Sequence, residues 1–338
     1  MLKTIKKIYI LDDNLDFCKQ IKNLIKHLGE IFIFTDPKIF LNKIETETPD
    51  LVLVDLNLNH PKYNGFDIIK TIKKKIDSHL ISIIMVSGED SSDILSKAFH
   101  SGIEDYVHKP IMPNFFMQKI NHVLYQSKIK LHTNALTGLP GILLIEEEYL
   151  KWINLNKPFS IAYLDLDQFK PFNDYKGVKA GDKAIQLLAH CFKEIRASYD
   201  KKQLYTGHLG GDDFFILGYK TVIRKFIGGV YKKYPDMIKN LFSKTEIENG
   251  FYKGKTRDGK IKEIPLITIS TAVINIAPEA KNSFDLISKY AASVKKKAKS
   301  ITGNSKVEIN LTGIFEKNKN LFTEEQKKKE IITNIKIS

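Results

Sequence analysis

Two acidic clusters follow apolar runs in the second half of the chain. The run from Tyr205 to Leu217 is interrupted by Gly210-Gly211-Asp212-Asp213, and the run that ends at Leu164 is followed by Asp165-Leu166-Asp167. The two glycines predict a tight hairpin, because glycine tolerates backbone angles that other residues avoid. Adjacent carboxylates repel each other unless a cation neutralises them. An acidic turn would explain the first cluster alone, but both clusters together, with Lys170 nearby, favour a site for magnesium and a nucleotide triphosphate.

A second set of polar residues follows the apolar runs of the first half. Helix-like segments, with apolar residues three and four apart, separate these short runs. The alternation predicts a five-stranded parallel sheet with helices on both faces, an α/β architecture of the flavodoxin type. Sites in such sheets lie at the carboxyl ends of the strands. The predicted strands and the residues after them are 7–11 with Asp12 and Asp13, 31–34, 50–54 with Asp55, 81–86 with Ser87, and 105–107 with Lys109.

This constellation, over about residues 4–128, resembles the receiver domain of a two-component response regulator. The resemblance implies that a sensor histidine kinase or phosphotransfer protein phosphorylates Asp55. It also implies a cis bond before Pro110, and roles for Ser87 and Lys109 in contacting the phosphoryl group and for Tyr106 as an aromatic switch. One Mg²⁺ ion would be held by Asp12, Asp13, Asp55 and the carbonyl of Asn57. A solvated strand end would explain any single acid, but all of these residues in order are hard to explain by chance.

The second half, over about residues 133–311, resembles the GGDEF domains, the diguanylate cyclases. The resemblance implies an α/β nucleotide-cyclase-like domain with a mainly antiparallel sheet, and a homodimer that condenses two GTP molecules into cyclic di-GMP and pyrophosphate. The motifs that carry it are Leu136-Thr137-Gly138-Leu139-Pro140, Asp165 to Lys170, Asn173-Asp174, Gly181-Asp182, Gly210 to Phe214, and Thr268-Ile269-Ser270.

The same resemblance assigns roles to individual residues of the second half. Asp165, the carbonyl of Leu166, and Asp212 would hold one or two Mg²⁺ ions, with Asp212 also a general base and Asp213 supporting the metal or the base. Lys170 and Lys299 would meet the triphosphate. Asn173 and Asp182 would read the guanine edge, since a carboxylate can accept from both of its N–H donors.

Several positions depart from the GGDEF pattern. His208 and Gly303 stand where the family has arginine, Val178 where it has histidine, and Lys176 where it has an aromatic residue. These departures leave open an alternative: a degenerate GGDEF domain that binds GTP or cyclic di-GMP and signals without turnover. Lys201 and Leu204 replace the arginine and aspartate of the family's product-inhibition site, which predicts a cyclase without inhibition there.

The element pattern predicts four segments: a receiver domain over 1–128, a helical linker and domain entrance over 129–139, a GGDEF domain over 140–314 and a tail over 315–338. Met117, Ile120, Leu124, Ser127 and Leu131 form a heptad-like seam suited to a weak dimer helix. In the second domain we predict helices over 140–152, 179–195 and 283–300, and a helical stretch over 222–242 that is interrupted at Gly228-Gly229 and Pro235. The predicted strands are 158–164, 251–253, 264–276 and 306–309, with a turn at Arg257 to Lys260. We expect a frayed helix in the tail.

Composition limits the class of protein. The chain has 338 residues and a net charge of +14, but much of that charge is lysine in runs such as 72–75 and 295–297, which we interpret as solvated helix faces. No helix-turn-helix or zinc-finger pattern accompanies the charge, so we expect no DNA partner. No apolar run approaches a membrane span, no signal peptide opens the chain, and Cys18 and Cys191 form neither a disulfide framework nor a zinc spacing. We therefore expect a cytoplasmic protein with no membrane partner.

Overall fold

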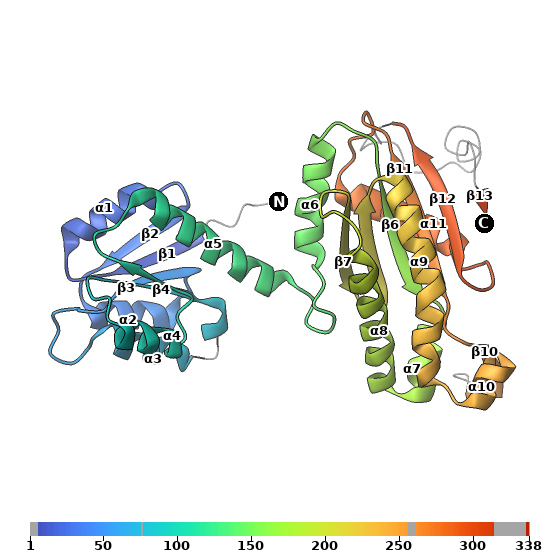
Figure 1. The fold of residues 1–338 in the computed structure, drawn as a ribbon, viewed down its shortest axis with the longest axis horizontal. Coiled ribbons are helices and arrows are strands. Elements are labelled where there is room, and N and C mark those ends of the chain that lie inside the picture. The colour runs from blue at the N-terminus through green and yellow to red at the C-terminus, as the bar shows by residue number, and fades with distance from the viewer. Residues whose placement is uncertain (1–5, 76, 256–260, 314–335, 338) are drawn as a thin grey trace. The chain divides into compact units, whose positions relative to one another are not determined.

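The computed structural model describes residues 6–75, 77–255, 261–313 and 336–337 (Figure 1). The chain forms two compact units, Met1–Leu131 and His132–Ser338.

The first unit is built on a five-stranded parallel sheet, as the sequence predicts. Its strand order is β2-β1-β3-β4-β5, and every neighbouring pair runs parallel. The strands are β1 (Lys6–Leu11), β2 (Gly29–Phe34), β3 (Leu51–Asp55), β4 (Ser82–Ser87) and β5 (Asp105–His108). The helices are α1 (Leu15–Ile25), α2 (Pro37–Thr46), α3 (Gly65–Lys73), α4 (Ser92–His100) and α5 (Pro113–His132), with a 3₁₀ turn η1 (Ser78–Leu80).

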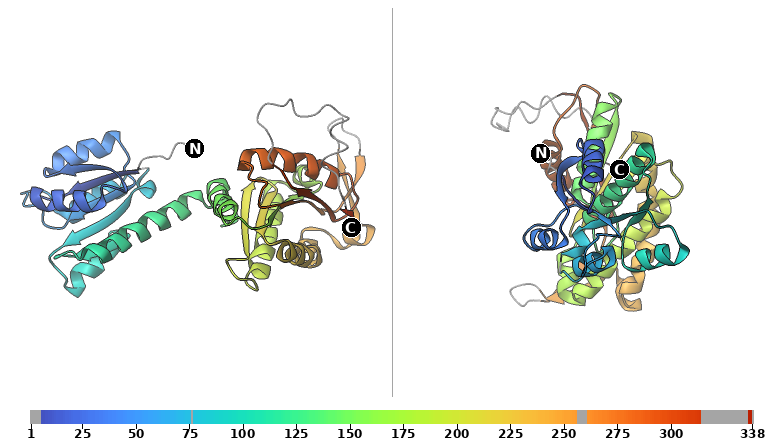
Figure 2. Two further views of the ribbon diagram at one scale, coloured as in Figure 1. Left: turned by 90° about the horizontal axis from the view of Figure 1, so that it is seen from above. Right: turned by 90° about the vertical axis from the view of Figure 1, so that its left-hand side faces the viewer.

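Helices cover both faces of this sheet (Figures 1 and 2). Apolar residues of α1 and α5, among them Ile21 and Phe116, pack with one face of the strands. Apolar residues of α2, α3 and α4, among them Phe40 and Ile69, pack with the other. Because both faces are covered, the central strands are apolar throughout, which is what a parallel sheet requires.

Helix α5 carries the predicted dimer seam. Ile120 and Leu124 are buried in the core of the first unit, and Met117 packs against that core. Leu131, in the last turn, is 41% exposed. The first turns of the seam therefore cover the unit's own sheet, and self-association through the remainder stays a prediction.

The second unit is built on a six-stranded sheet with the order β13-β12-β11-β6-β8-β7. All neighbouring pairs are antiparallel except β11 with β12, so the predicted mainly antiparallel sheet is confirmed. The strands are β6 (Phe159–Leu166), β7 (Leu204–Gly210), β8 (Asp213–Gly218), β11 (Ile269–Ile276), β12 (Ser305–Leu311) and β13 (Lys336–Ile337).

Helices again cover both faces (Figures 1 and 2). Helices α6 (Ile142–Asn154) and α11 (Phe284–Ala298) pack on the face that carries Ile161, Tyr163 and Phe215. Helices α8 (Val178–Arg196) and α9 (Lys220–Ile238) pack on the opposite face, with Leu164 and Phe214. The remaining elements of the unit are α7 (Phe169–Lys176), η2 (Lys239–Leu241), α10 (Lys244–Asn249), and the antiparallel pair β9 (Phe251–Lys255) and β10 (Ile261–Pro265).

The prediction of an interrupted helix over 222–242 is wrong for its middle. Helix α9 runs without a break through Gly228, Gly229 and Pro235. Its apolar face, which includes Val230 and Tyr234, is fully buried. A Cβ at Gly229 would lie 3.3 Å from a methyl group of Ile195, so glycine here allows α9 to approach α8 closely. Packing of the apolar face overrides the weak helix propensity of these residues.

The single strand predicted over 264–276 is also wrong. The segment divides into β10 and β11, which belong to different sheets. Pro265 ends β10, and proline has no N–H with which to extend a strand's ladder. The predicted turn at Arg257–Lys260 lies outside the described residues, as does most of the predicted tail helix. Of the tail, residues 336–337 are described and form β13 beside β12.

Candidate functional site

In the first unit, a lysine and two acids meet at the carboxyl end of the sheet. Asp12 follows β1, Asp55 ends β3, and both side chains are buried. The Lys109 ammonium lies 2.7 Å from Asp12 Oδ2 and 2.9 Å from Asp55 Oδ1. The bond between Lys109 and Pro110 is cis, as expected. Residues almost a hundred positions apart thus form one ion-paired cluster.

The electrostatics of this cluster leave an excess of negative charge. Burial raises the pKa of Asp55 even though Lys109 is beside it. Burial alone would lower the pKa of Lys109, but its bonds to Asp12 and Asp55 raise it above its ordinary value. In the described part of the chain, Asp12, Asp13 and Asp55 form the one group of three acids whose ligand oxygens all lie within 4.8 Å of one another. Three carboxylates that one ammonium neutralises only in part provide oxygen ligands that fit Mg²⁺.

The other predicted receiver residues surround the acids. The Asn57 N–H donates to Asp55 Oδ2 over 2.9 Å, and the Asn57 amide donates to Glu89 over 2.8 Å. The Tyr106 hydroxyl donates to the Glu89 carbonyl, and the buried Ser87 Oγ accepts from the Glu89 N–H over 3.2 Å. Sequence reasoning missed Glu89, which holds Asn57, Ser87 and Tyr106 around one loop.

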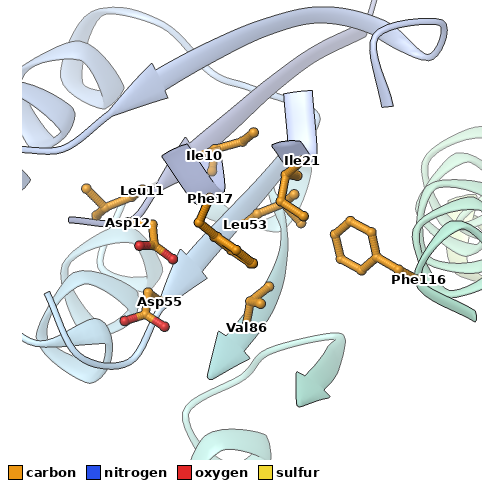
Figure 3. A pocket seen from close by; sticks show the side chains of 9 residues that line it. All are labelled: Ile10, Leu11, Asp12, Phe17, Ile21, Leu53, Asp55, Val86 and Phe116. Atoms are coloured by element: carbon orange, nitrogen blue, oxygen red, sulfur yellow. The ribbon is translucent and has the colours of Figure 1, made fainter. Parts of the chain in front are cut away.

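A small cavity lies directly behind the two buried acids. Figure 3 shows Asp12 and Asp55 at one side of it and Phe116 of α5 at the other, with Phe17 of α1 between them. Apart from the two acids, its lining is apolar. The packing is therefore incomplete between the acids and the first turn of α5.

In the second unit, two predicted site acids face each other across the sheet. Asp165 on β6 and Asp213 on β8 are cross-strand partners in an antiparallel pair. Because side chains alternate along a strand, both carboxylates share the face of Tyr163 and Phe215, on which α11 packs. The predicted hairpin is present, and Gly210 (φ 133°) and Gly211 (φ 58°) adopt angles that favour glycine.

Two lysines reach these acids: Lys295 in the last turns of α11 and Lys299 directly after its end. The Lys295 ammonium lies 2.9 Å from Asp165 Oδ2 and also bonds Asp213 Oδ1. The Lys299 ammonium lies 2.5 Å from Asp165 Oδ1. Our interpretation of 295–297 as a solvated helix face is therefore wrong for Lys295. Residues four apart share one side of a helix, so Lys295 belongs with Lys299 beside the buried face of Val294 and Ala298.

Burial and mutual repulsion shape the ionisation of the hairpin acids. Burial, followed by the charge of Asp165, raises the pKa of Asp212 to about 6. Burial also raises the pKa of Asp213, against the opposing effect of Lys295. The buried Asp165 Oδ1 lies 2.5 Å from the Lys299 ammonium, an ion pair that lacks hydrogen-bond geometry. A buried carboxylate oxygen beside further acids, without a well-formed hydrogen bond, fits a Mg²⁺ ligand.

The loop after β6 is anchored through Asp167. Its carboxylate accepts from the hydroxyls of Thr268 (2.8 Å) and Ser270 (2.7 Å), and its N–H donates to the Thr268 carbonyl. Gln168 follows in the left-handed conformation, so the chain turns sharply into α7. These bonds fix the position of the Leu166 carbonyl. Sequence reasoning missed this role of Asp167, although the paired hydroxyls in Thr268-Ile269-Ser270 are a signal for it.

The predicted guanine-reading residues come together between α7 and α8. Asn173 Oδ1 is buried with no hydrogen-bond partner, and it rests on Gly181, where a Cβ would lie only 1.6 Å away. Asp182, the next residue, is half-buried. An unpaired acceptor beside a carboxylate suits a ligand edge with N–H donors. Lys170 is exposed on the first turn of α7.

His208, one of the departures, is part of the structure of the hairpin. It is buried and stacks on Phe214 at a ring-centroid distance of 4.5 Å. Its Nε2 lies 2.9 Å from the Gly211 carbonyl, and its Nδ1 lies 3.1 Å from Thr137 Oγ1. A carbonyl can only accept, so Nε2 carries a hydrogen. Burial lowers the pKa of His208, which leaves Nδ1 free to accept from the Thr137 hydroxyl.

The structure also shows the surroundings of the other residues that depart from the GGDEF pattern. Lys176 bonds Glu246 of α10 over 2.8 and 3.0 Å, which ties α10 to α7. Val178 is 71% exposed, and Gly303 has a positive φ with nothing near its Cβ position. At the position of the family's product site, Leu204 is fully buried in β7 and Lys201 is exposed.

Two stretches of the chain match known protein families, and curated proteins and solved structures are similar to part of it. Residues 8–121 match the response regulator receiver domain, and residues 131–248 match the family described as diguanylate cyclase, GGDEF domain. The chain is 26% identical over 125 residues to the alkaline phosphatase synthesis transcriptional regulatory protein PhoP of Bacillus subtilis, an alignment that covers 37% of this chain and 50% of PhoP. It is 27% identical over 106 residues to protein RcaC of Microchaete diplosiphon, covering 31% of this chain and 16% of RcaC. The chain thus spans half or less of the length of these two relatives.

One similar solved structure is a receiver domain protein. A CheY-like receiver domain protein from Methanospirillum hungatei is 26% identical, with a TM-score of 0.34, and the match covers 38% of this chain and 99% of that one. Within the described residues, no helix is both long and apolar enough to cross a membrane. From the two family matches, the chain carries an N-terminal response regulator receiver domain followed by a C-terminal GGDEF domain.

Proposed function

We propose that this protein is a phosphorylation-regulated diguanylate cyclase that condenses two GTP molecules into cyclic di-GMP. The observation that carries the proposal is the arrangement of Asp165 and Asp213, cross-strand partners paired with the two lysines at the end of α11. The Asp212 carboxyl stands beside them in the glycine turn. The same domain offers an unpaired acceptor, Asn173 Oδ1, for a base with N–H donors.

The reaction needs positioning and charge neutralisation more than covalent chemistry. In each of two steps, a 3′-hydroxyl oxygen bonds to the α-phosphorus of the other GTP. The bond from that phosphorus to the pyrophosphate oxygen breaks, and the hydroxyl proton leaves. Bound Mg²⁺ would supply positive charge against the oxyanions that develop during transfer.

Particular residues of the chain would hold the metal ions, accept the proton and bind the substrate. Asp165, the Leu166 carbonyl and Asp212 would hold one or two Mg²⁺ ions, and Asp212 would accept the proton from the 3′-hydroxyl, with Asp213 in support. Lys170 and Lys299 would bind the triphosphate, while Asn173 and Asp182 select guanine. Because each domain holds one GTP, two copies must face each other, so we propose a homodimer as the active form.

The receiver would control this assembly. A sensor histidine kinase or phosphotransfer protein would place a phosphoryl group on Asp55, with Mg²⁺ held by Asp12, Asp13, Asp55 and the Asn57 carbonyl. Lys109 already bonds Asp55 and would pair with the new phosphoryl oxygens. The Ser87 hydroxyl would bond the phosphoryl group, and Tyr106, now bonded to the Glu89 carbonyl, would move with it. The absence of a membrane-spanning pattern in the sequence supports action in the cytoplasm.

The test is a direct assay of the purified full-length protein. GTP and Mg²⁺ are incubated with it, with and without acetyl phosphate as a small phosphoryl donor, and nucleotides are separated and identified by mass. We expect cyclic di-GMP and pyrophosphate, with a higher rate in the presence of the donor. GTP or cyclic di-GMP binding without any product would contradict the proposal and favour the non-catalytic signalling module.

A further inference from the structure

Lys295 is the feature of the GGDEF domain that the proposed roles do not use. It stands in the last turns of α11, one residue after the buried Val294 and four before Lys299. Helix α11 packs on the sheet through Ile287, Ala291 and Val294. This packing directs Lys295 toward the end of β6 and the start of β8, where Asp165 and Asp213 lie.

The contacts of Lys295 are those of an internal ion pair. Its ammonium bonds one oxygen of Asp165 and one of Asp213, and its side chain is only 20% exposed. The ammonium is therefore held between two carboxylates, and opposite charges this close favour its charged form. By contrast, Lys299 is 42% exposed and pairs with Asp165 Oδ1 over 2.5 Å.

Lys295 changes the charge that a metal ion meets. Asp165, Asp212 and Asp213 carry three negative charges when all are ionised, and Lys295 offsets one of them from within the cluster. It also occupies Asp165 Oδ2 and Asp213 Oδ1, two oxygens that could otherwise bind metal. Among the described residues, these three acids do not form a group whose oxygens all lie within 4.8 Å, unlike the receiver acids. Asp165 Oδ1 lies beside Asp212 and pairs with Lys299, the lysine that the proposed function assigns to the triphosphate.

We propose that Lys295 is a resident cation of the cyclase site, standing in place of one of the two metal ions that its three acids would otherwise attract. The site then takes a single Mg²⁺ ion, held through Asp165 Oδ1 and Asp212, while Lys295 keeps Asp213 and Asp165 Oδ2 neutralised. This inference rests on the proposed function, because it concerns how the proposed catalytic site is charged.

Metal counting tests this inference without relying on turnover. Equilibrium dialysis of Mn²⁺ against the full-length protein, saturated with α,β-methylene GTP, counts the ions bound per chain. The analogue cannot release pyrophosphate, so no reaction alters the count. The same measurement on Asp165→Asn supplies the baseline from the receiver site alone. We expect the wild-type chain to bind one ion above this baseline.

Variants of α11 then assign the effect to Lys295. Lys295→Met keeps the length of the side chain without its charge, and we expect it to bind two ions above the baseline. Without nucleotide, its affinity for Mn²⁺ should rise on the order of tenfold or more, because a unit positive charge a few ångströms away has been removed. Lys295→Arg should restore the single ion. Lys296→Met, on the exposed neighbour, is the matched control and should behave as the wild type.

The possible outcomes separate this inference from the proposed function. Two ions above the baseline in the wild-type chain, or an unchanged count and affinity in Lys295→Met, would overturn the role of Lys295. If Lys295→Met does not fold, the wild-type count still decides. Failure of the proposed function would instead appear as absence of product in the assay with GTP and Mg²⁺, whatever the Mn²⁺ count.

Discussion

Asp165 and Asp213 are cross-strand partners, and both of their carboxylates bond the ammonium of Lys295. Like charges directly opposite each other destabilise an antiparallel pair. A fold that depended on stability alone would not place two acids there. The arrangement is instead what a site for charged phosphates and metal requires, because it concentrates negative charge that a cation can balance.

The first prediction concerns these acids. Asp165→Asn or Asp212→Asn should lower the rate of cyclic di-GMP formation at least about a hundredfold, as for the loss of a main electrostatic stabiliser. The measurement is steady-state product formation, with thermal unfolding recorded to confirm that the variants fold. Near-normal turnover in either folded variant would place the metal ion elsewhere.

The second prediction concerns the phosphoacceptor. Asp55→Asn is nearly isosteric, so the fold should be preserved while phosphorylation by acetyl phosphate is lost. Basal cyclase activity should remain, and its rise with the donor should vanish. Phosphoryl transfer is read on a phosphate-affinity gel in parallel with product formation. A donor response that persists in Asp55→Asn would reject the assignment of Asp55.

The third prediction concerns the network of His208, Thr137 and Gly211. His208→Ala removes a buried bond to the glycine turn and should cost about 1–3 kcal/mol of unfolding free energy. Thr137→Val removes the partner hydroxyl, and the double variant should lose less than the sum of the two single losses. Urea unfolding of the isolated variants gives all three values. Strict additivity would show that His208 and Thr137 do not act together.

The same histidine predicts a dependence of stability on pH. Burial lowers the pKa of His208, so the folded state binds this proton less readily than the unfolded state, whose histidine pKa is about 6.5. The stabilisation is therefore fully present above about pH 6.5 and declines as the pH falls below it. The difference in unfolding free energy between the wild type and His208→Ala should shrink from pH 8 to pH 5.5. A constant difference would contradict a neutral His208.

The fourth prediction concerns feedback. Leu204 is buried in β7, and Lys201 offers a single ammonium where an arginine would offer a planar guanidinium with paired N–H donors. This face therefore lacks the groups that would bind a cyclic dinucleotide. Cyclic di-GMP titrated into the purified protein should not inhibit it through this face, as followed by calorimetry and by the cyclase rate. Tight binding that is lost in Lys201→Ala, with turnover retained, would contradict the prediction.

The two sheets could be predicted from the sequence because polar residues stand directly after the apolar runs that form the strands. Asp12, Asp55 and Lys109 each follow an apolar run, so parallel pairing had to gather them at one edge. Lys295 could not be recognised in this way, because a run of three lysines on a helix resembles a solvated face until the packing of Val294 and Ala298 fixes its rotation. The continuity of α9 through Pro235 was equally hidden, since burial of its apolar face outweighs local propensity.

The cavity between the receiver acids and Phe116 has a mechanical consequence. Phe116 and Phe17 both line this small, partly open cavity, so the packing between α5 and the strands is less tight there than in a fully filled core. Hydrostatic pressure favours arrangements that eliminate internal void volume. Compression should therefore move the first turn of α5 toward Asp12 and Asp55, so that pressure acts on the same helix end that lies behind the proposed phosphoacceptor.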